Sequence, residues 1–242
     1  MKKIALALLI IILTTATIAQ ACGDRIYDIQ TDPVAHPVGT LGVPCDVIVT
    51  ATLSNGFFCQ QMPAAGEPAT GEYSGVWVYT ADDRGYVPGD ILAVCGEIKE
   101  FFGLTELDVN AAGLYGYTLK TGSGAPLAPY VVGAAMVDAD GEPWESVQIT
   151  ISDGMEVPVG FDLGFEEWNA IALDGTAVRL EGGDWYDFLN VMEGQCYNSA
   201  TGIYFWSFGD FKLKPFVDGI PIVDCAVGVE SMSMGALKAT FR

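Results

Sequence analysis

His36 is the only histidine of this chain, and it is the first candidate for acid–base or nucleophilic catalysis. A catalytic histidine works with a nucleophile or a carboxylate that is held beside it. No nucleophile motif of the G-x-S-x-G type occurs in the sequence. His36 lies between Ala35 and Pro37, in a segment expected to be a loop, and we interpret it as a surface residue. No catalytic residue is therefore assigned.

Metal-binding patterns are equally weak. With one histidine and no C-x-x-C pair, a structural zinc site is not expected. The acidic run from Asp138 to Glu142 resembles a calcium loop, but its glycine, Gly141, is the fourth residue. An EF-hand needs glycine at the sixth position and glutamate at the twelfth. We interpret this run as a turn, and we predict neither a metal site nor a cofactor.

Carboxylate pairs could supply the general acid and base of a glycosidase. The candidates are Glu166 with Glu167, and the group Glu97, Glu100 and Glu106. Such pairs arise by chance in a chain with 31 acidic residues. A small barrel that is filled by its own side chains also offers no deep cleft. The sequence therefore predicts that the protein is not an enzyme.

Aromatic residues make a stronger candidate site. Because side chains alternate along a strand, Trp77 and Tyr79 share one face of the segment 75–80, and Val76 and Val78 share the other. The valines are expected to face the core, which leaves Trp77 and Tyr79 on the outer face. Exposed rings of this kind stack on bases or sugars. The alternative is that these rings pack against another part of the protein.

Four further residues complete the candidate ligand-binding set. Phe57 and Phe58 are adjacent, so they point to opposite faces of their strand, and one of them is expected to join the aromatic pair. Lys212 and Lys214 alternate with apolar residues and form a small basic stripe, which could guide a phosphate or a carboxylate.

Short strands and tight turns are predicted along the whole chain. β-Branched and aromatic residues dominate segments such as 47–53, 75–80 and 146–152. The pairs Asn55-Gly56 and Asp174-Gly175 are strong hairpin signals. The 29 glycines and 12 prolines suit many short strands, and no long segment has helical periodicity. The predicted class is all-β.

One fragment occurs twice, at a spacing typical of a repeated domain. Each copy has two glycines and a leucine at the same spacing, with an aromatic residue before the second glycine. The first copy is Gly96, Phe102, Gly103 and Leu107, and the second is Gly202, Phe208, Gly209 and Leu213. For a chain of 242 residues, this repeat predicts two tandem small β-barrels.

Residues 1–21 are expected to be a cleaved signal peptide. Lys2 and Lys3 precede an apolar stretch, and Ala19-Gln20-Ala21 has the small-x-small pattern of a cleavage site. The apolar stretch is short for a membrane span, so no integral membrane span is predicted. Cleavage just before Cys22 also describes lipoprotein processing, which would leave a lipid anchor on that residue. Either route predicts a protein that is secreted or held at the cell envelope.

Cysteine content agrees with export. The chain has six cysteines, enough for three disulfides in an oxidising compartment. Their pairing cannot be deduced from the sequence. The candidates are Cys22, Cys45, Cys59, Cys95, Cys196 and Cys225.

The charge balance bears on the kind of partner. There are 31 acidic residues against 11 basic ones, and the formal net charge is −20. Such a field repels polyanions at long range, and nucleic-acid binding relies on lysine and arginine to neutralise phosphates. A neutral glycan or a protein is therefore at least as suitable a ligand as DNA.

Several short motifs follow one another in a recognisable order. In the first half they are IYDIQ at 26–30, VTA at 49–51, NGFF-x-Q at 55–60, SG-x-x-VYT at 74–80 and GD-x-x-x-V-x-G-x-x-x-EFFGLTEL at 89–107. In the second half they lie at 142–149, 168–175, 178–180 and 201–215. Together they resemble the secreted OB-fold modules that accompany bacterial extracellular nucleases of the endonuclease/exonuclease/phosphatase superfamily, although the nuclease domain is not in this chain.

This resemblance implies two OB-fold-like modules at 22–119 and 130–223, with a linker at 120–129 and a tail at 224–242. The predicted function is a non-catalytic, exported binding or accessory protein. It would present an aromatic strand face to an extracellular polymer, either DNA or a glycan, or to a protein partner. Two alternatives stay open. One is a structural envelope or scaffolding protein with no small ligand, and the other is an accessory subunit of a separate extracellular nuclease.

Overall fold

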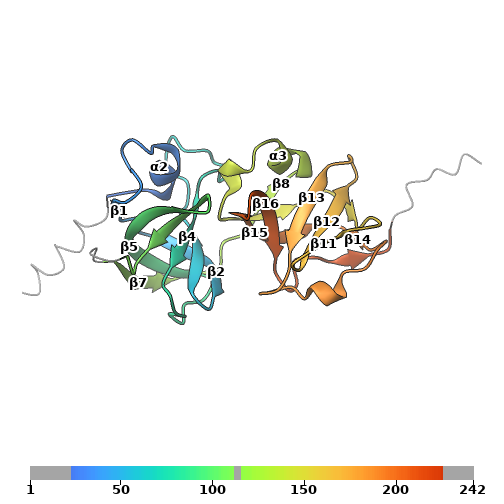
Figure 1. Ribbon diagram of the computed structural model, residues 1–242. Helices are drawn as coiled ribbons and strands as arrows, with labels where there is room; N and C mark the ends of the chain where they lie inside the picture. The colour runs from blue at the N-terminus through green and yellow to red at the C-terminus, as the bar shows by residue number, and fades with distance from the viewer. Residues whose placement is uncertain (1–22, 112–115, 226–242) are drawn as a thin grey trace, which may run out of the picture.

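The computed structural model describes residues 23–111 and 116–225 (Figure 1). The protein is mostly β, with two sheets that form two halves lying side by side (Figure 1). We call residues 23–123 the first half and residues 130–225 the second half. The predicted signal peptide, Cys22 and most of the predicted tail lie outside the described residues.

The first half contains one short helix and a seven-stranded sheet. Its elements are α2 (Ile26–Thr31), β1 (Leu41–Gly42), β2 (Val47–Leu53), β3 (Gly56–Gln60), β4 (Gly75–Tyr79), β5 (Asp90–Phe101), β6 (Leu104–Asp108) and β7 (Tyr117–Ser123). The long strand β5 pairs with β2 and with β6, and the ladders β2–β3, β3–β4 and β4–β6 connect those two strands. The sheet therefore curls back onto β5. The β4–β6 ladder is parallel, and the others in this circuit are antiparallel.

The core of the first half follows from the alternation of side chains along these strands. Val76 and Val78 on β4 point inward and are fully buried, as the sequence predicts. Leu107 on β6 and Ile98 on β5 join them, and Ile26 from α2 covers one side of the cluster. Complete burial of such side chains contributes about 1.5–3 kcal/mol each.

The second half contains a ten-stranded sheet and three short helices. The strands are β8 (Tyr130–Val132), β9 (Val147–Ile151), β10 (Met155–Glu156), β11 (Asp162–Gly164), β12 (Glu167–Ala172), β13 (Ala177–Glu181), β14 (Cys196–Tyr197), β15 (Ala200–Ser207), β16 (Asp210–Pro215) and β17 (Ile222–Val223). The helices are α3 (Ala134–Ala139), η1 (Glu142–Trp144) and η2 (Phe188–Asn190). The order β9–β15–β16–β13–β12 repeats that of the first half, and β13–β16 is again parallel. Here β10, which follows β9 along the chain, makes the ladder to β12.

The repeated fragment forms the same hairpin in both halves, β5–β6 in the first and β15–β16 in the second. Each hairpin turns at a phenylalanine and a glycine that both have positive φ: Phe102 (53°) with Gly103 (92°), and Phe208 (50°) with Gly209 (90°). Two successive residues with positive φ match the twist of a tight antiparallel hairpin, and glycine adopts that conformation without strain. The aromatic–glycine pair in the repeat is therefore the turn itself.

The first glycine of each copy meets a different requirement, which is close approach of the partner strand. A Cβ atom on Gly96 would lie 3.0 Å from the carbonyl carbon of Leu107. A Cβ atom on Gly202 would collide with the carbonyl oxygen of Lys214. Backbone therefore excludes a side chain at Gly202, and it leaves only a tight space for one at Gly96.

The connection between the halves is shorter than the predicted linker at 120–129. Lys120 to Ser123 belong to β7, which pairs with β5, so the segment without regular structure is 124–129. The Gly/Ser-rich composition that suggested a linker is compatible with an edge strand. Among the described residues, neither α2 nor α3 nor any other helix is long and apolar enough to cross a membrane.

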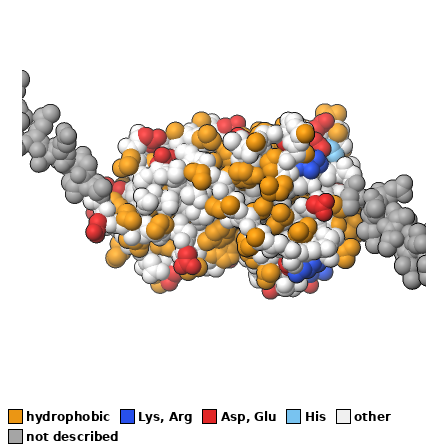
Figure 2. Space-filling model, turned by 180° about the vertical axis from the view of Figure 1, so that it is seen from behind, with side chains coloured by type: hydrophobic (Ala, Val, Ile, Leu, Met, Phe, Trp, Pro, Cys, Tyr) orange, Lys and Arg blue, Asp and Glu red, His pale blue; other side chains and the backbone are white. Residues whose placement is uncertain are grey.

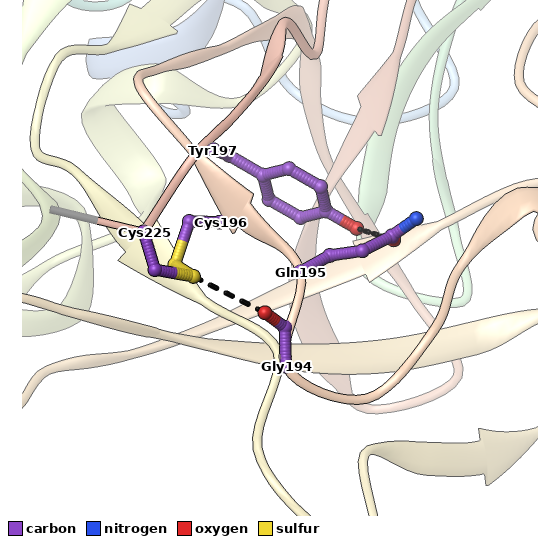
Figure 3. Close-up of a disulfide and its surroundings, with 5 residues drawn as sticks. All are labelled: Gly194, Gln195, Cys196, Tyr197 and Cys225. Carbon is purple, nitrogen blue, oxygen red and sulfur yellow. Dashed lines mark hydrogen bonds between the residues drawn. A yellow bond between two sulfur atoms is a disulfide. The ribbon is translucent and has the colours of Figure 1, made fainter. Parts of the chain in front are cut away.

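A disulfide between Cys196 and Cys225 fastens the end of the described chain to β14 (Figure 3). The Cys225 sulfur lies 3.1 Å from the carbonyl oxygen of Gly194. The neighbouring Tyr197 hydroxyl reaches the Gln195 side chain at 3.4 Å (Figure 3). The sequence separation of 29 residues closes a loop large enough to stabilise the fold by about 3 kcal/mol.

Three of the predicted disulfide candidates lie in the first half. Cys45 is disulfide-bonded. Cys59, which the parity of the cysteines had placed in a disulfide, is instead a free thiol. It is fully buried on β3 within the apolar core, and this burial raises its pKa. Cys95 is buried on β5, and burial raises its pKa as well. Cys59 therefore behaves as a small apolar core residue.

Candidate functional site

The outer faces of the two sheets meet at an apolar junction. Phe58 on β3 and Trp77 on β4 pack against Ile203 and Phe205 on β15, in a cluster separate from the core of either half. Trp77 is only 7% exposed, while Tyr79 is partly buried at the edge of the cluster. Most of the aromatic face that the sequence predicted to be exposed is therefore buried in the junction.

The two adjacent phenylalanines of β3 separate as the alternation of side chains requires. Phe57 points into the core of the first half, where its ring centroid lies 5.3 Å from that of Tyr86. Phe58 points outward, with its ring centroid 4.6 Å from that of Trp77. Of the pair, Phe58 is therefore the one on the candidate face.

Side-chain hydrogen bonds cross the junction at four places, in addition to a backbone hydrogen bond from Tyr73 N to Pro143 O (2.6 Å), and hold the halves in a defined arrangement. They link side chains of one half to backbone of the other, so they fix both spacing and register. The four are Gln148 N to Gln60 Oε1 (2.7 Å), Thr105 N to Glu145 Oε1 (2.9 Å), Trp206 Nε1 to Phe102 O (2.8 Å) and Trp185 Nε1 to Thr52 O (3.2 Å).

A groove of about 670 Å³ remains along this junction, lined mainly by aromatic rings from both halves. Hydrophobic side chains gather where the two halves meet (Figure 2). The two repeated turns flank the groove, and Phe102 (78% exposed) and Phe208 (93% exposed) lie in its wall. The aromatic lining consists of Phe58, Trp77, Tyr79, Phe101, Phe102, Phe205, Trp206 and Phe208.

The charged residues of the groove come mostly from β5 and β6. Lys99 and Trp77 are both register partners of Glu106, so the three side chains form a row across β5, β6 and β4. The Lys99 ammonium group pairs with Asp108, two residues further along β6. The carboxyl group of Glu106 makes no hydrogen bond with any described residue, although Glu106 is only 5% exposed. Burial, together with the nearby charge of Asp108, raises the pKa of Glu106 to about 7.

The basic stripe predicted at Lys212 and Lys214 is not an open surface, which corrects that prediction. Lys212 is 0% exposed and pairs with Glu167 and Glu181. Lys214 is nearly as buried, and it pairs with Glu181 and with Asp184. Both lysines do share the outer face of β16, but carboxylates from the neighbouring strands surround them. Neither ammonium group is available to guide a phosphate.

The two hairpins carry opposite charges at equivalent positions. In the first half Glu106 and Asp108 flank the repeated leucine of β6, and in the second half Lys212 and Lys214 flank the repeated leucine of β16. In the sequence, Glu106 was one of several candidate catalytic carboxylates that the high acidic content explains. Its position beside the repeated leucine was the signal that could have placed it on the same face as the lysines.

The remaining sequence candidates lie outside this groove. His36 Nδ1 is 3.7 Å from Asp24 Oδ1, in the first half. Glu167 is engaged by Arg179 and Lys212, which lower its pKa against the opposing effect of burial. Residues 138–141 line a second, more polar hollow of about 700 Å³ together with Asp210. Across 23–111 and 116–225, no group of three or more His, Cys, Asp or Glu side chains is arranged to hold a metal ion.

No model of a known protein family matches this chain. No curated protein matches it either.

Proposed function

We propose that this protein is an exported, non-catalytic binding protein that holds a neutral glycan chain in the groove between its halves. The observation that carries this proposal is the lining of the groove, where rings from both halves surround a few carboxylates. Ligand sites are usually concave and mainly apolar, with a small number of placed polar groups. Sugar rings present apolar faces that stack on aromatic rings, and their hydroxyl groups bind carboxylates.

We propose further that each half is an OB-fold module. The circuit of strands β2–β3–β4–β6–β5, with its one parallel ladder, supports this assignment, as does its repetition in the second half. OB-folds bind ligands on the face of their second and third strands, together with the loops after the first and fourth. In the first half these correspond to β3, β4, the turn at Asn55 and the turn at Phe102, and all four contribute to the groove.

Charge favours a neutral ligand over a nucleic acid. The groove contains two lysines, and both are paired: Lys99 with Asp108, and Lys214 with Glu181 and Asp184. Affinity for DNA or RNA depends on free lysine and arginine side chains that neutralise phosphates. The net charge of −20 opposes a polyanion as well.

A scaffolding protein without a small ligand is the second candidate, and it has its own supporting observation. The burial of Phe58 and Trp77 at the junction is the arrangement that a purely structural role would require. The third candidate, an accessory subunit of a separate extracellular nuclease, rests on the family resemblance alone. Export to an oxidising compartment is supported by the disulfide between Cys196 and Cys225.

Binding to an oligosaccharide array tests these candidates. The array would carry neutral hexose, pentose and N-acetylated hexosamine oligomers, beside single-stranded DNA at two salt concentrations. We expect the purified protein to bind at least one neutral oligomer. Phe208→Ala should weaken that binding by about fivefold to tenfold, because one stacking ring contributes about 1 kcal/mol.

Phe165→Ala is the matched control for this experiment. Phe165 is 95% exposed and has a positive φ like Phe208, but it lies in a turn that does not line the groove. It should bind like the unmodified protein. Salt-sensitive binding to DNA alone would favour the nuclease-accessory role, and binding to nothing on the array would favour the scaffolding role.

A further inference from the structure

Glu106 stands out among the charged residues of the groove because it is buried without a partner. It is 5% exposed, it lies in the groove wall, and no described residue donates a hydrogen bond to its carboxyl group. A buried carboxyl group normally has hydrogen-bond partners, since leaving one unsatisfied destabilises the fold. Its side chain points outward, because Leu107, the next residue on β6, fills the core.

The lysine that could neutralise Glu106 is directed elsewhere. Lys99 is the register partner of Glu106 on β5, yet its ammonium group pairs with Asp108 and lies 3.9 Å from Glu97. On β4 the register partner is Trp77, which has no charge to offer. From the second half, the cation in the groove wall is Lys214, and its own carboxylates hold it.

The equivalent position in the second half shows what a structural role looks like. Lys212 is buried even more completely than Glu106, but it has two carboxylate partners, Glu167 and Glu181. At this equivalent position, the charge of the side chain is neutralised by ion pairs in the second half but has no ion-pair partner among the described residues of the first. A polar group left open in the wall of a groove is free to bind something that enters it.

We propose that Glu106 is the polar anchor of the groove and hydrogen-bonds a hydroxyl group of the bound glycan. The assignment rests on the proposed function and specifies one contact within it. The exposed rings of Phe102 and Phe208 would hold the sugar faces, and Glu106 would select for a hydroxyl group at one position.

The chemistry of Glu106 also predicts how binding depends on pH. Its pKa is already raised to about 7 by burial and by Asp108, with Lys99 opposing the shift. A ligand that fills the groove removes the remaining water from Glu106 and favours its neutral form still more. A protonated carboxyl group can both donate to and accept from a hydroxyl group. Binding should therefore be tighter at pH 6 than at pH 8.

Two variants of Glu106 test the proposal on the array described above. Glu106→Leu removes the hydrogen-bonding group and should weaken binding at pH 6 by roughly fivefold to tenfold. Glu106→Gln keeps a donor and an acceptor, so it should bind at pH 6 within about threefold of the unmodified protein. It should also lose the difference between pH 6 and pH 8.

Glu145→Gln is the matched control, because Glu145 is equally buried at the junction but does not line the groove. It should leave affinity and its dependence on pH unchanged. The unfolding temperature of each variant verifies that it is folded, and neither Glu106 variant should unfold below the unmodified protein.

The outcomes separate the two proposals. If Phe208→Ala weakens binding but Glu106→Leu does not, the groove binds glycan and the role of Glu106 is wrong. If the unmodified protein binds no oligosaccharide, the proposed function is wrong, and so is the proposed role of Glu106.

Discussion

The hairpins β5–β6 and β15–β16 share one backbone arrangement and carry opposite charges. In the second half, Lys212 and Lys214 are surrounded by carboxylates from neighbouring strands. In the first half, one lysine, Lys99, forms ion pairs with Asp108 and Glu97. The carboxyl group of Glu106 has no such partner among the described residues. The repeated backbone determines where these side chains point. The residues on the strands beside them decide whether a charge stabilises the fold or remains open for a ligand.

The largest expected effect on stability comes from removing the ion pairs of the second hairpin. Lys212→Met should lower the free energy of unfolding by about 3 kcal/mol, because Glu167 and Glu181 lose the buried ammonium group between them and keep only Arg179 and Lys214. Urea denaturation followed by tryptophan fluorescence measures the change.

Lys214→Met is the comparison variant, because its partner Asp184 is more exposed than the partners of Lys212. The free energy of unfolding should fall less in Lys214→Met than in Lys212→Met. Equal stability of Lys212→Met and the unmodified protein would show that the ion pairs around Lys212 contribute nothing to the fold.

A second prediction concerns Glu145, which reaches from the second half to the backbone of the first hairpin. It accepts a hydrogen bond from Thr105 N, and its other oxygen has no partner among the described residues. Burial raises the pKa of Glu145 to about 8, against the opposing hydrogen bond from Thr105. Since its pKa in the unfolded chain is near the ordinary value of 4.5, unfolding releases a proton between these two values.

Stability should therefore be fully present below about pH 4.5 and fall as pH rises toward 8, by up to about 1.4 kcal/mol per pH unit from this group. Glu145→Gln stays neutral, so its stability should fall less over the same range. Unfolding curves at pH 5, 6, 7 and 8 for both proteins measure the difference. Parallel pH profiles would mean that Glu145 does not titrate in this range.

The smallest expected effect on stability comes from replacing Glu106, the carboxyl group in the first hairpin without an ion-pair partner among the described residues. At pH 8 Glu106→Gln should be more stable than the unmodified protein by about 1–2 kcal/mol, because its neutral side chain avoids a buried, unpaired charge. At pH 4 the two should be nearly equal, since Glu106 is then mostly protonated in both the folded and the unfolded chain. Thermal unfolding at both pH values measures this, and a loss of stability at pH 8 would assign Glu106 to the fold instead of the groove.

Local features of the fold followed directly from the sequence. The alternation of Val76 and Val78 with Trp77 and Tyr79 correctly predicted which side chains enter the core. The repeated aromatic–glycine pairs, which the sequence showed only as a repeat, are turns in the structure, with positive φ at two successive residues. Both features depend only on neighbours along the chain.

The candidate site was predicted only in part. Phe58 and Trp77 do line the groove, but the sequence could not tell that Ile203 and Phe205 would cover them. Lys212 and Lys214 looked like an open stripe because their carboxylates lie on β12, β13 and the segment after it. Cys59 had counted toward six cysteines and three disulfides, yet its strand places it in the apolar core.

The sequence by itself therefore determined the mostly β class, the repeated fragment and the inward face of β4. These depend on a period of two residues and on turn geometry, which are properties of adjacent residues. Only the tertiary structure decided the use of the outer faces. Whether Trp77 is covered, Lys212 neutralised or Glu106 left open depends on residues far away along the chain, which meet only when the two halves pack together.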